Sequence, residues 1–399
     1  MRILFIAMAN SIHTARWIDQ LAGRGWDIHL FPVESGRLHP DLKNLTIHDF
    51  LPHKPYGSNH GLRLAGAWPF PGGATLARHI MKRLMPSWSD RVRRLARTIS
   101  KLKPDIVHSL EMQHAGYLTL DAKNHLDGKF PPWIFTPWGS DIYLFGRLSE
   151  HARKIKDVLS SCNYYAGECH RDVKLARAFG FDGEVLMISP VTGGFNTEQL
   201  WLFRQPGPTS ARRLILLKGY QNWAGRALVG LQAIRLSADV LKGYRIAVYL
   251  ANQDVRIAAE LLSQSTGIPI EIVPRSSHDE MLRLHGRARV SIGLSISDGI
   301  SVSMLEAMVM GSFPVQSNTS CGNEWIRDGE TGRLVFPEDP ENVAGAIRLA
   351  VTDDALVDSA SDINARLTAE RANESLIKPE VVNMYKKVFS RGKSQYVVK

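Results

Sequence analysis

The stretch that decides the fold runs from Ser297 to Pro340 and reads SDGISVSMLEAMVMGSFPVQSNTSCGNEWIRDGETGRLVFPEDP. A mostly apolar run from Val290 to Ile296 precedes it and is short enough to be a buried parallel strand. Gly299 interrupts the pattern, and a helix is predicted from about Ser301 to Met310. The first amides of such a helix lack partners, and its dipole favours an anion. A strand, a glycine turn and a helix in this order predict an α/β fold that binds phosphate at the turn.

Two acids flank this turn, Asp298 before the helix and Glu306 within it, and their separation is 306 − 298 = 8 residues. In a continuous helix that spacing places them roughly 80° apart and about 12 Å along the axis. Carboxylates so far apart do not share a proton, but they can hold the two ends of an elongated ligand whose central diphosphate lies at the helix tip. A nucleotide sugar has that shape. An N-cap aspartate and a solvated helical glutamate remain the simpler alternative.

The segment resembles the signature of the retaining glycosyltransferases of family four, which have the GT-B fold of two Rossmann-like domains facing a cleft. The residues that match that signature are Asp298–Gly299, Leu305–Glu306–Ala307–Met308, Gly311, Pro314–Val315, Gly322, Glu324, Asp328–Gly329, Gly332, Leu334–Val335 and Pro337. The family usually has glutamate where this chain has Asp298, so the carboxylate is about one methylene shorter. The resemblance implies an α/β GT-B fold and a nucleotide-sugar substrate.

The composition is that of a globular protein, with 399 residues, 44% hydrophobic content and a formal net charge of +10. Its length favours two or three domains, and it lacks an apolar run of the roughly eighteen residues that a membrane span needs. The N-terminal MRILFIAMANS is predicted to be a first strand and not a signal peptide. Three cysteines form no disulfide or metal framework. We therefore expect a cytoplasmic location.

The positive charge is concentrated in residues 54–103, which hold eleven bases and one acid, so that 11 − 1 = +10 equals the whole excess. Residues 54–74 are predicted to be irregular, with helices at 75–84 and 90–102. Such a patch can face an anionic membrane surface, an acidic acceptor or nucleic acid. Nucleic acid is the weakest of these, because no recognisable binding module accompanies the charge. An ordinary sheet-covering helix with a solvated cationic face is the alternative.

The first half begins with a predicted strand at 3–7, a helix at 12–22 and a strand at 28–31. Ser11 is a plausible N-cap, and His13 can reach a ligand at the strand ends. A surface or packing histidine is the competing interpretation. The absence of G-x-G-x-x-G here argues against a dinucleotide cofactor. Relatives in the resembled family begin with a similar Ser-Ile-His-Thr-x-Arg-Trp segment that faces the cleft.

Further polar residues follow the next predicted strands of this half, at 106–108 and 133–136. Glu111 follows the first, and Trp138 and Asp141 follow the second, at the strand ends where open sheets bind ligands. The family commonly has His-Gly-x-Asp at the latter turn, so Asp141 fits and Trp138 departs. The flat apolar face of a tryptophan suits stacking on a sugar ring. These residues, with Ser11 and His13, are our candidates for the acceptor side.

The second half begins after a predicted linker at 201–212, with strands expected at 214–217, 246–251 and 270–273. Lys218 and Arg226 flank the first junction of strand and helix, where two cations can neutralise a diphosphate. Two solvated surface bases are the alternative from spacing alone, and the resemblance favours the site. The predicted domains are 1–200 and 213–378, with a C-terminal helix crossing back over 379–399. The candidate donor-binding residues are Gly299, Ile300, Ser301, Val302, Arg275 and Ser276.

The resemblance implies a retaining, metal-independent glycosyltransferase that moves a sugar from a nucleotide sugar to a glycan or lipid-linked acceptor. We expect no cofactor. An anionic membrane surface is one expected partner, bound peripherally through residues 54–103, and we expect a role in surface-polysaccharide assembly. Lys218 and Arg226 would receive the diphosphate, Glu306 the ribose and Asp298 the sugar. Two alternatives remain open at this point, namely a GT-B-fold sugar-nucleotide 2-epimerase and a non-catalytic scaffold with the same fold.

Overall fold

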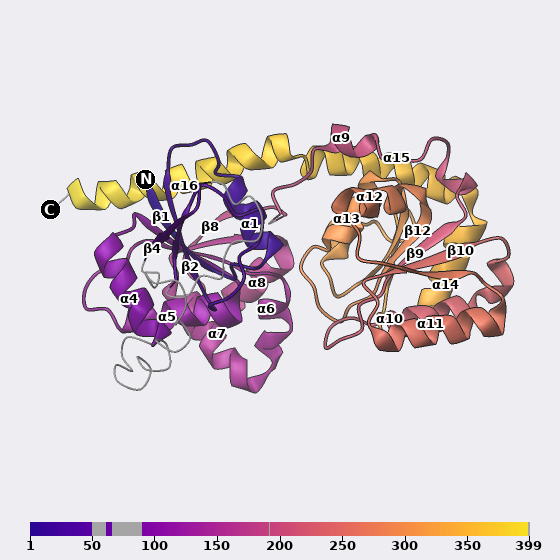
Figure 1. Ribbon diagram of the computed structural model, residues 1–399, viewed down its shortest axis with the longest axis horizontal. Helices are drawn as coiled ribbons and strands as arrows, with labels where there is room; N and C mark the ends of the chain where they lie inside the picture. The colour runs from indigo at the N-terminus through magenta and orange to yellow at the C-terminus, as the bar shows by residue number, and fades with distance from the viewer. Residues whose placement is uncertain (50–60, 66–89, 191, 398–399) are drawn as a thin grey trace, which may run out of the picture. The chain divides into compact units, whose positions relative to one another are not determined.

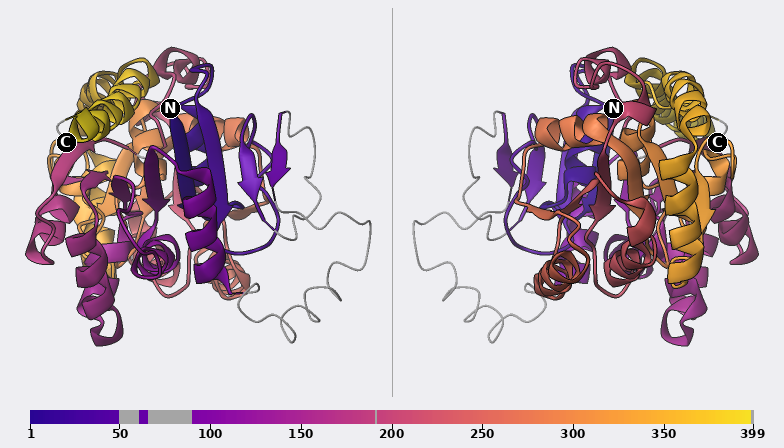
Figure 2. Two further views of the ribbon diagram at one scale, coloured as in Figure 1. Left: turned by 90° about the vertical axis from the view of Figure 1, so that its left-hand side faces the viewer. Right: turned by 90° about the vertical axis from the view of Figure 1, so that its right-hand side faces the viewer.

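The chain forms two α/β units, seen in a computed structural model that describes residues 1–49, 61–65, 90–190 and 192–397 (Figure 1). The first unit comprises residues 1–193 and 377–399, and the second comprises residues 194–376. Helices cover both faces of the sheet in each unit (Figures 1 and 2). Among the described residues, no helix combines the length and the apolar character that a membrane crossing requires.

The first unit is built on a parallel sheet whose described strands lie in the order β4-β3-β2-β1-β5-β6-β7-β8. Its strands are β1 (Arg2–Ala7), β2 (Asp27–Pro32), β3 (Thr46–His48), β4 (Arg63–Ala65), β5 (Ile106–Leu110), β6 (Trp133–Thr136), β7 (Tyr164–Gly167) and β8 (Glu184–Ile188). Its helices are α1 (Ile12–Asp19), α4 (Arg91–Leu102), η1 (Met112–Gly116), α5 (Tyr117–Asn124), α6 (Ser140–Tyr143), η2 (Phe145–Arg147), α7 (Ser149–Ser161), α8 (His170–Ala178) and most of α16 (Glu374–Val397).

The central strand of this unit is apolar on both faces, as a parallel strand covered by helices must be. In β1, Ile3 and Phe5 belong to the core that also contains α1 and α16, whereas Leu4 and Ile6 belong to the core beneath α4, α5 and α7. Successive side chains of a strand point to opposite faces. The run Ile3–Ala7 therefore contributes apolar side chains to two cores at once.

The C-terminal helix α16 is fastened to the first unit by a buried chain of hydrogen bonds. The Tyr385 hydroxyl lies 2.8 Å from Trp17 Nε1 and 2.6 Å from His108 Nδ1. His108 Nε2 lies 2.9 Å from the Thr136 hydroxyl. Burial lowers the pKa of His108 to about 3, so its ring is neutral. Because an indole N–H can only donate, the Tyr385 oxygen accepts from Trp17 and its proton is donated to His108.

The second unit has a smaller parallel sheet in the order β11-β10-β9-β12-β13-β14. Its strands are β9 (Leu214–Lys218), β10 (Arg245–Tyr249), β11 (Ile270–Val273), β12 (Ala288–Gly293), β13 (Phe313–Ser317) and β14 (Arg333–Val335). Its helices are α9 (Thr197–Trp201), η3 (Thr209–Ala211), α10 (Ala227–Leu236), η4 (Ala238–Val240), α11 (Gln253–Thr266), α12 (His278–Arg287), α13 (Val302–Val309), η5 (Gly322–Glu324), α14 (Pro340–Thr352) and α15 (Asp354–Arg371).

Several predicted bounds differ from the observed ones. Residues 194–212 belong to the second unit, so the predicted linker at 201–212 is packed: Thr209 Oγ1 donates to the Gly311 carbonyl at 2.7 Å, and Arg212 is 2% exposed. The prolines and glycines of this segment indicated an irregular backbone, but a segment with an irregular backbone can still be buried. The C-terminal helix, predicted over 379–399, begins earlier, at Glu374, and ends at Val397.

The strand predicted at 290–296 corresponds to β12, which ends at Gly293. The apolar residues after Gly293, such as the buried Leu294, belong to the following loop. The predicted irregular segment 54–74 is described only at 61–65, where β4 forms. The rest of that segment and the helix predicted at 75–84 lie outside the described residues.

Candidate functional site

The order of strands in the second unit marks one edge of its sheet as a place for a ligand. The chain passes from β9 outward through β10 to β11, then returns to β12 on the other side of β9. Open parallel sheets bind their ligands outside the carboxyl ends of the strands at such a reversal. The segments that follow β9 and β12, residues 219–226 and 294–301, therefore define the candidate site.

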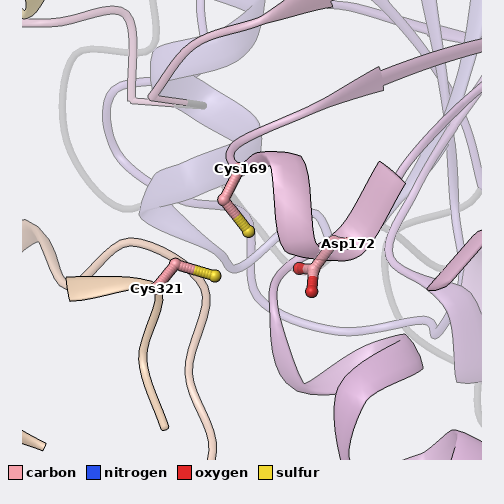
Figure 3. A group of neighbouring side chains, drawn as sticks. All are labelled: Cys169, Asp172 and Cys321. Atoms are coloured by element: carbon pink, nitrogen blue, oxygen red, sulfur yellow. The ribbon is translucent and has the colours of Figure 1, made fainter. Parts of the chain in front are cut away.

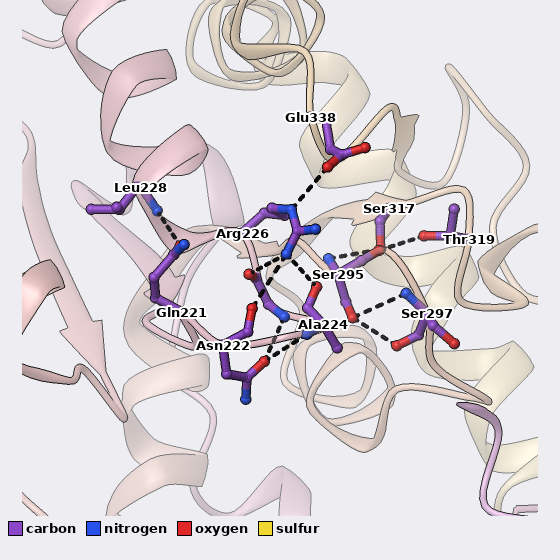
Figure 4. A network of polar contacts seen from close by, with 11 residues as sticks. Gln221, Asn222, Ala224, Arg226, Leu228, Ser295, Ser297, Ser317, Thr319 and Glu338 are labelled. Atoms are coloured by element: carbon purple, nitrogen blue, oxygen red, sulfur yellow. Dashed lines mark hydrogen bonds and ion pairs between the residues drawn. The ribbon is translucent and has the colours of Figure 1, made fainter. Parts of the chain in front are cut away.

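These two segments are joined to one another by backbone hydrogen bonds, and Figure 4 shows side chains from both of them. The Arg226 amide donates to the Leu294 carbonyl at 3.1 Å, and the Ile296 amide donates to the Ala224 carbonyl at 2.9 Å. Gly219 begins the first segment, and a Cβ atom there would lie 2.8 Å from the Tyr249 carbonyl oxygen, which only glycine avoids. The loop after β9 is thus held against both neighbouring strand ends.

The two predicted cations lie at the two ends of the loop after β9. Lys218 is the last residue of β9, is half-buried, and has its Nζ 4.8 Å from the centroid of the Tyr220 ring. Arg226 is the N-cap of α10; its Nε pairs with Glu338 at 3.0 Å and its Nη1 donates to the Gly225 carbonyl at 3.0 Å (Figure 4). Since Glu338 is 67% exposed, this ion pair contributes little to stability.

The glycine turn after β12 leads into α13, whose N-cap is Ser301. The Ser301 hydroxyl contacts the Ser303 hydroxyl at 3.1 Å and does not cap the helix. Asp298 accepts a hydrogen bond from the Gly299 amide at 2.9 Å and is half-buried. Ile300 is buried. The first amides of α13 therefore receive no hydrogen bond from the N-cap side chain, which is the arrangement that favours an anion.

Glu306, in the second turn of α13, has a buried carboxylate in contact with histidines of α12. Its Oε1 lies 2.7 Å from His278 Nε2, and its Oε2 lies 3.9 Å from His285 Nε2. Burial lowers the pKa of His285 to about 4, with nearby Lys218 acting in the same direction. His285 is therefore neutral near pH 7, and its Nδ1 lies 3.1 Å from the Ser291 hydroxyl.

The turn between β11 and α12 carries the remaining candidates of this unit. Arg275 is exposed, and Ser276 is half-buried and donates to the Pro274 carbonyl at 3.0 Å. The same turn leads to His278 and so approaches Glu306. Neither His278 nor His285 was among the candidate site residues. Their spacing of two helical turns was the signal available in the sequence, but that spacing is common on any amphipathic helix.

The first unit has a similar reversal, because β1 lies between β2 and β5. Ser11 follows β1, is the N-cap of α1, and accepts from the His13 amide at 3.1 Å. The ring centroids of His13 and Trp138 lie 5.4 Å apart. Two of the predicted acceptor residues, one after β1 and one after β6, are therefore brought together at one edge of the sheet.

The two acids of this edge are occupied by backbone amides. Glu111 accepts from the amides of Gln113 and His114 at 2.7 and 2.8 Å, and Asp141 accepts from the amides of Met112 and Trp138 at 3.0 and 2.8 Å. Burial, reinforced by the Glu111 charge, raises the pKa of Asp141. Glu111 also has φ 83° and ψ 149°, a region that residues other than glycine seldom adopt. Strain of this kind at a strand end is characteristic of functional sites.

The cationic helix α4 is only partly available to a partner. Arg91 Nη2 donates to the Ser35 hydroxyl at 2.9 Å, and Arg94 lies 3.8 Å from the buried Asp49. Both side chains therefore anchor the helix to its own unit. Arg93 and Lys101 are exposed. Most of the basic stretch before this helix lies outside the described residues.

Cys169 and Asp172 lie at the start of α8, and Figure 3 draws them with Cys321, which belongs to the second unit. Asp172 is buried and pairs with Arg171 at 2.8 Å. Within either unit taken alone, the described residues present no trio of His, Cys, Asp or Glu ligand atoms within 4.8 Å of one another.

Comparison with known proteins gives matches in both halves of the chain. The model of the family described as "Glycosyl transferase 4-like" matches residues 2–66 and 76–166, and that of "Glycosyl transferases group 1" matches residues 249–367. A curated relative, GDP-mannose:cellobiosyl-diphosphopolyprenol alpha-mannosyltransferase of Komagataeibacter xylinus, is 26% identical over 248 residues, or 60% of this chain. The matched region spans 58% of that relative's length.

Solved structures share the whole fold at low identity. Sucrose-phosphate synthase of Thermosynechococcus elongatus has a TM-score of 0.69 at 14% identity, covering 98% of this chain and 100% of that one. HepE of Anabaena, solved with UDP-glucose, has a TM-score of 0.68 at 12% identity, covering 97% and 100%. Together with the two parallel sheets, these similarities confirm the predicted GT-B fold.

Proposed function

Because the chain belongs to the group 1 glycosyltransferases of the family-four type, we propose that it transfers a sugar from a nucleotide-sugar donor to a lipid-linked glycan acceptor, with retention of configuration. The observation that carries this proposal is the reversal point of the second unit. There Lys218 ends β9, Arg226 is the N-cap of α10, and the start of α13 follows β12, with the buried carboxylate of Glu306 in the second turn of α13.

The donor diphosphate would lie against Lys218, Arg226 and the first amides of α13. These groups offer fixed positive charge where negative charge develops on the leaving group, which is the largest single contribution in many enzymes. We propose that they replace a metal ion in that role. Glu306 would accept hydrogen bonds from ribose hydroxyls, and Asp298 would hold hydroxyls of the transferred sugar.

The transfer itself would proceed on one face of the sugar. The bond between the anomeric carbon and the diphosphate oxygen breaks, and the acceptor oxygen bonds to the same face. The acceptor proton passes to the departing phosphate oxygen, so no protein base is required. This front-face course follows from the family resemblance, and retention distinguishes it from a single inverting displacement.

The acceptor would bind at the edge of the first unit where His13 and Trp138 lie together. An aromatic face of this kind suits a sugar ring. The curated relative is named for a diphosphopolyprenol-linked acceptor and for GDP-mannose, and a neighbouring structure was solved with UDP-glucose. We take a diphosphopolyprenol-linked oligosaccharide as the acceptor class, with these two nucleotide sugars as the first donors to test.

A lipid-linked acceptor would require the protein to work at the cytoplasmic face of a membrane. The exposed Arg93 and Lys101 of α4 support peripheral attachment to anionic lipid, in which each base near the surface adds about 1 kcal/mol. The anchoring roles of Arg91 and Arg94 reduce the number of bases that α4 can offer.

The test is incubation of the full-length protein with GDP-mannose or UDP-glucose, with and without a diphosphopolyprenol-linked oligosaccharide. Mass spectrometry detects glycosylated acceptor, and NMR of the product gives the anomeric configuration. A donor-dependent product with the donor's configuration supports the proposal. Conversion of the donor without acceptor would instead identify an epimerase. Donor binding without turnover of any acceptor tested would favour a scaffold.

A further inference from the structure

His278 has a contact with Glu306 that the proposed function does not use. His278 is the first residue of α12, and its Nε2 lies 2.7 Å from Glu306 Oε1 on α13. The Glu306 side chain is 10% exposed, and that of His278 is 42% exposed. This hydrogen bond joins two different helices and so ties the Glu306 carboxylate to a second element of the unit.

The backbone at the start of α12, from which the His278 side chain extends, is held by a capping box. Ser277 and Glu280 form a capping box, in which the Ser277 amide donates to Glu280 Oε2 at 2.7 Å and the Glu280 amide donates to Ser277 Oγ at 3.3 Å. This reciprocal pair sets the first turn of the helix. The residue that follows the cap therefore reaches Glu306 from a fixed position.

His285, the other histidine near Glu306, cannot replace this contact. Its Nε2 is 3.9 Å from Glu306 Oε2, beyond hydrogen-bond distance, and its Nδ1 faces the Ser291 hydroxyl at 3.1 Å. It is buried, so it cannot move toward the carboxylate without repacking. Of these two histidines, His278 alone holds Glu306 by a hydrogen bond.

We propose that His278 is a positioning residue that aims the Glu306 carboxylate at the ribose hydroxyls of the donor nucleotide. This inference rests on the proposed function. A carboxylate has about four acceptor sites, so the bond to His278 leaves capacity for ribose. Without His278 the carboxylate turns about its last side-chain torsion, which has a broad energy minimum. The affinity that ribose contributes is then lost, while contacts to the diphosphate are kept.

The experiment measures nucleotide affinity by calorimetry on the full-length protein, with GDP and UDP and their 2′,3′-dideoxy counterparts as probes. For the wild-type protein, removing the ribose hydroxyls should weaken binding about 10- to 150-fold, as expected for hydrogen bonds to a charged group. His278→Ala should lose about tenfold for the ribonucleotide and less than about twofold for the dideoxynucleotide. His278→Gln, whose amide nitrogen can reach the same oxygen, should recover most of the loss.

His114→Ala is the matched control, because it removes a similar contact between a histidine and a glutamate, His114 Nδ1 to Glu111 Oε1 at 3.2 Å, in the first unit. It should leave both nucleotide affinities unchanged. Equal losses for ribo- and dideoxynucleotides in His278→Ala would indicate general mispacking and overturn the inference, as would no loss. A wild-type protein that does not distinguish the two nucleotides also overturns it. If the wild type binds neither GDP nor UDP, the proposed function fails first and the inference falls with it.

Discussion

Removing the Tyr385 hydroxyl should destabilise the first unit far more than most Tyr→Phe changes do. In Tyr385→Phe, the Trp17 indole N–H and His108 Nδ1 both lose their partner while remaining buried. Each unpaired buried group costs about 1–3 kcal/mol, so the free energy of unfolding should fall by about 2–6 kcal/mol. Tyr143→Phe is the control: the Tyr143 hydroxyl has no hydrogen bond within the described residues, and its ring stays beneath Arg171.

The assay is amide hydrogen exchange, read by mass spectrometry on peptides from α16, β5 and the second unit. A loss of about 2 kcal/mol makes exchange in the α16 and β5 peptides about 30-fold faster, since about 1.4 kcal/mol corresponds to a factor of ten. Peptides of the second unit should be unchanged, because the hydrogen bonds lost belong to the first unit alone. An acceleration below about fivefold would refute the idea that this buried chain holds α16 in the first unit.

Three further outcomes are expected. Lys218→Ala should weaken GDP or UDP binding about tenfold or more, because a charge-assisted hydrogen bond to phosphate is lost, and should leave nucleoside binding unchanged. Calorimetry measures both affinities, and equal weakening of nucleotide and nucleoside would contradict a diphosphate at Lys218. Sugar transfer by the wild type should be unaffected by EDTA in a timed product assay, whereas loss restored by Mg²⁺ would mean that the cations do not suffice. The pKa of His285, about 4, lies below the unfolded value of about 6.5, so the unfolded chain binds more protons as the pH falls through this window. Urea unfolding should therefore show about 2–3 kcal/mol less stability for the second unit at pH 4.5 than at pH 7 from this group, and equal stability at both values would contradict a neutral buried His285.

Most of the fold could be predicted because buried parallel strands are short apolar runs. The predicted strands at 133–136 and 270–273 match β6 and β11 at both ends. The strand predicted at 290–296 extends beyond the end of β12 at Gly293, because an apolar residue such as Leu294 indicates burial and does not by itself indicate strand geometry. The packed segment at 201–212 was missed for a related reason: buried polar residues such as Arg212 find partners that are distant in the sequence.

The candidate site was predictable only where residues follow strand ends in sequence. Lys218 and Arg226 flank a predicted junction of strand and helix, and the family resemblance favoured them as site residues; the structure places both at the reversal point. The contact between His278 and Glu306 joins residues 28 positions apart, and no local pattern reports it. For Glu111 the local pattern is present but ambiguous. An acid after a strand can bind a ligand or accept hydrogen bonds from backbone amides, as Glu111 does from the Gln113 amide.

The central claim is that a diphosphate rests on the amides after Gly299, between Lys218 and Glu306. A crystal structure of the protein with GDP-mannose or UDP-glucose tests it most directly. The account predicts phosphate oxygens at the start of α13 within reach of Lys218, and ribose hydroxyls on Glu306. A nucleotide sugar bound elsewhere, or with its phosphates turned away from α13, would contradict it.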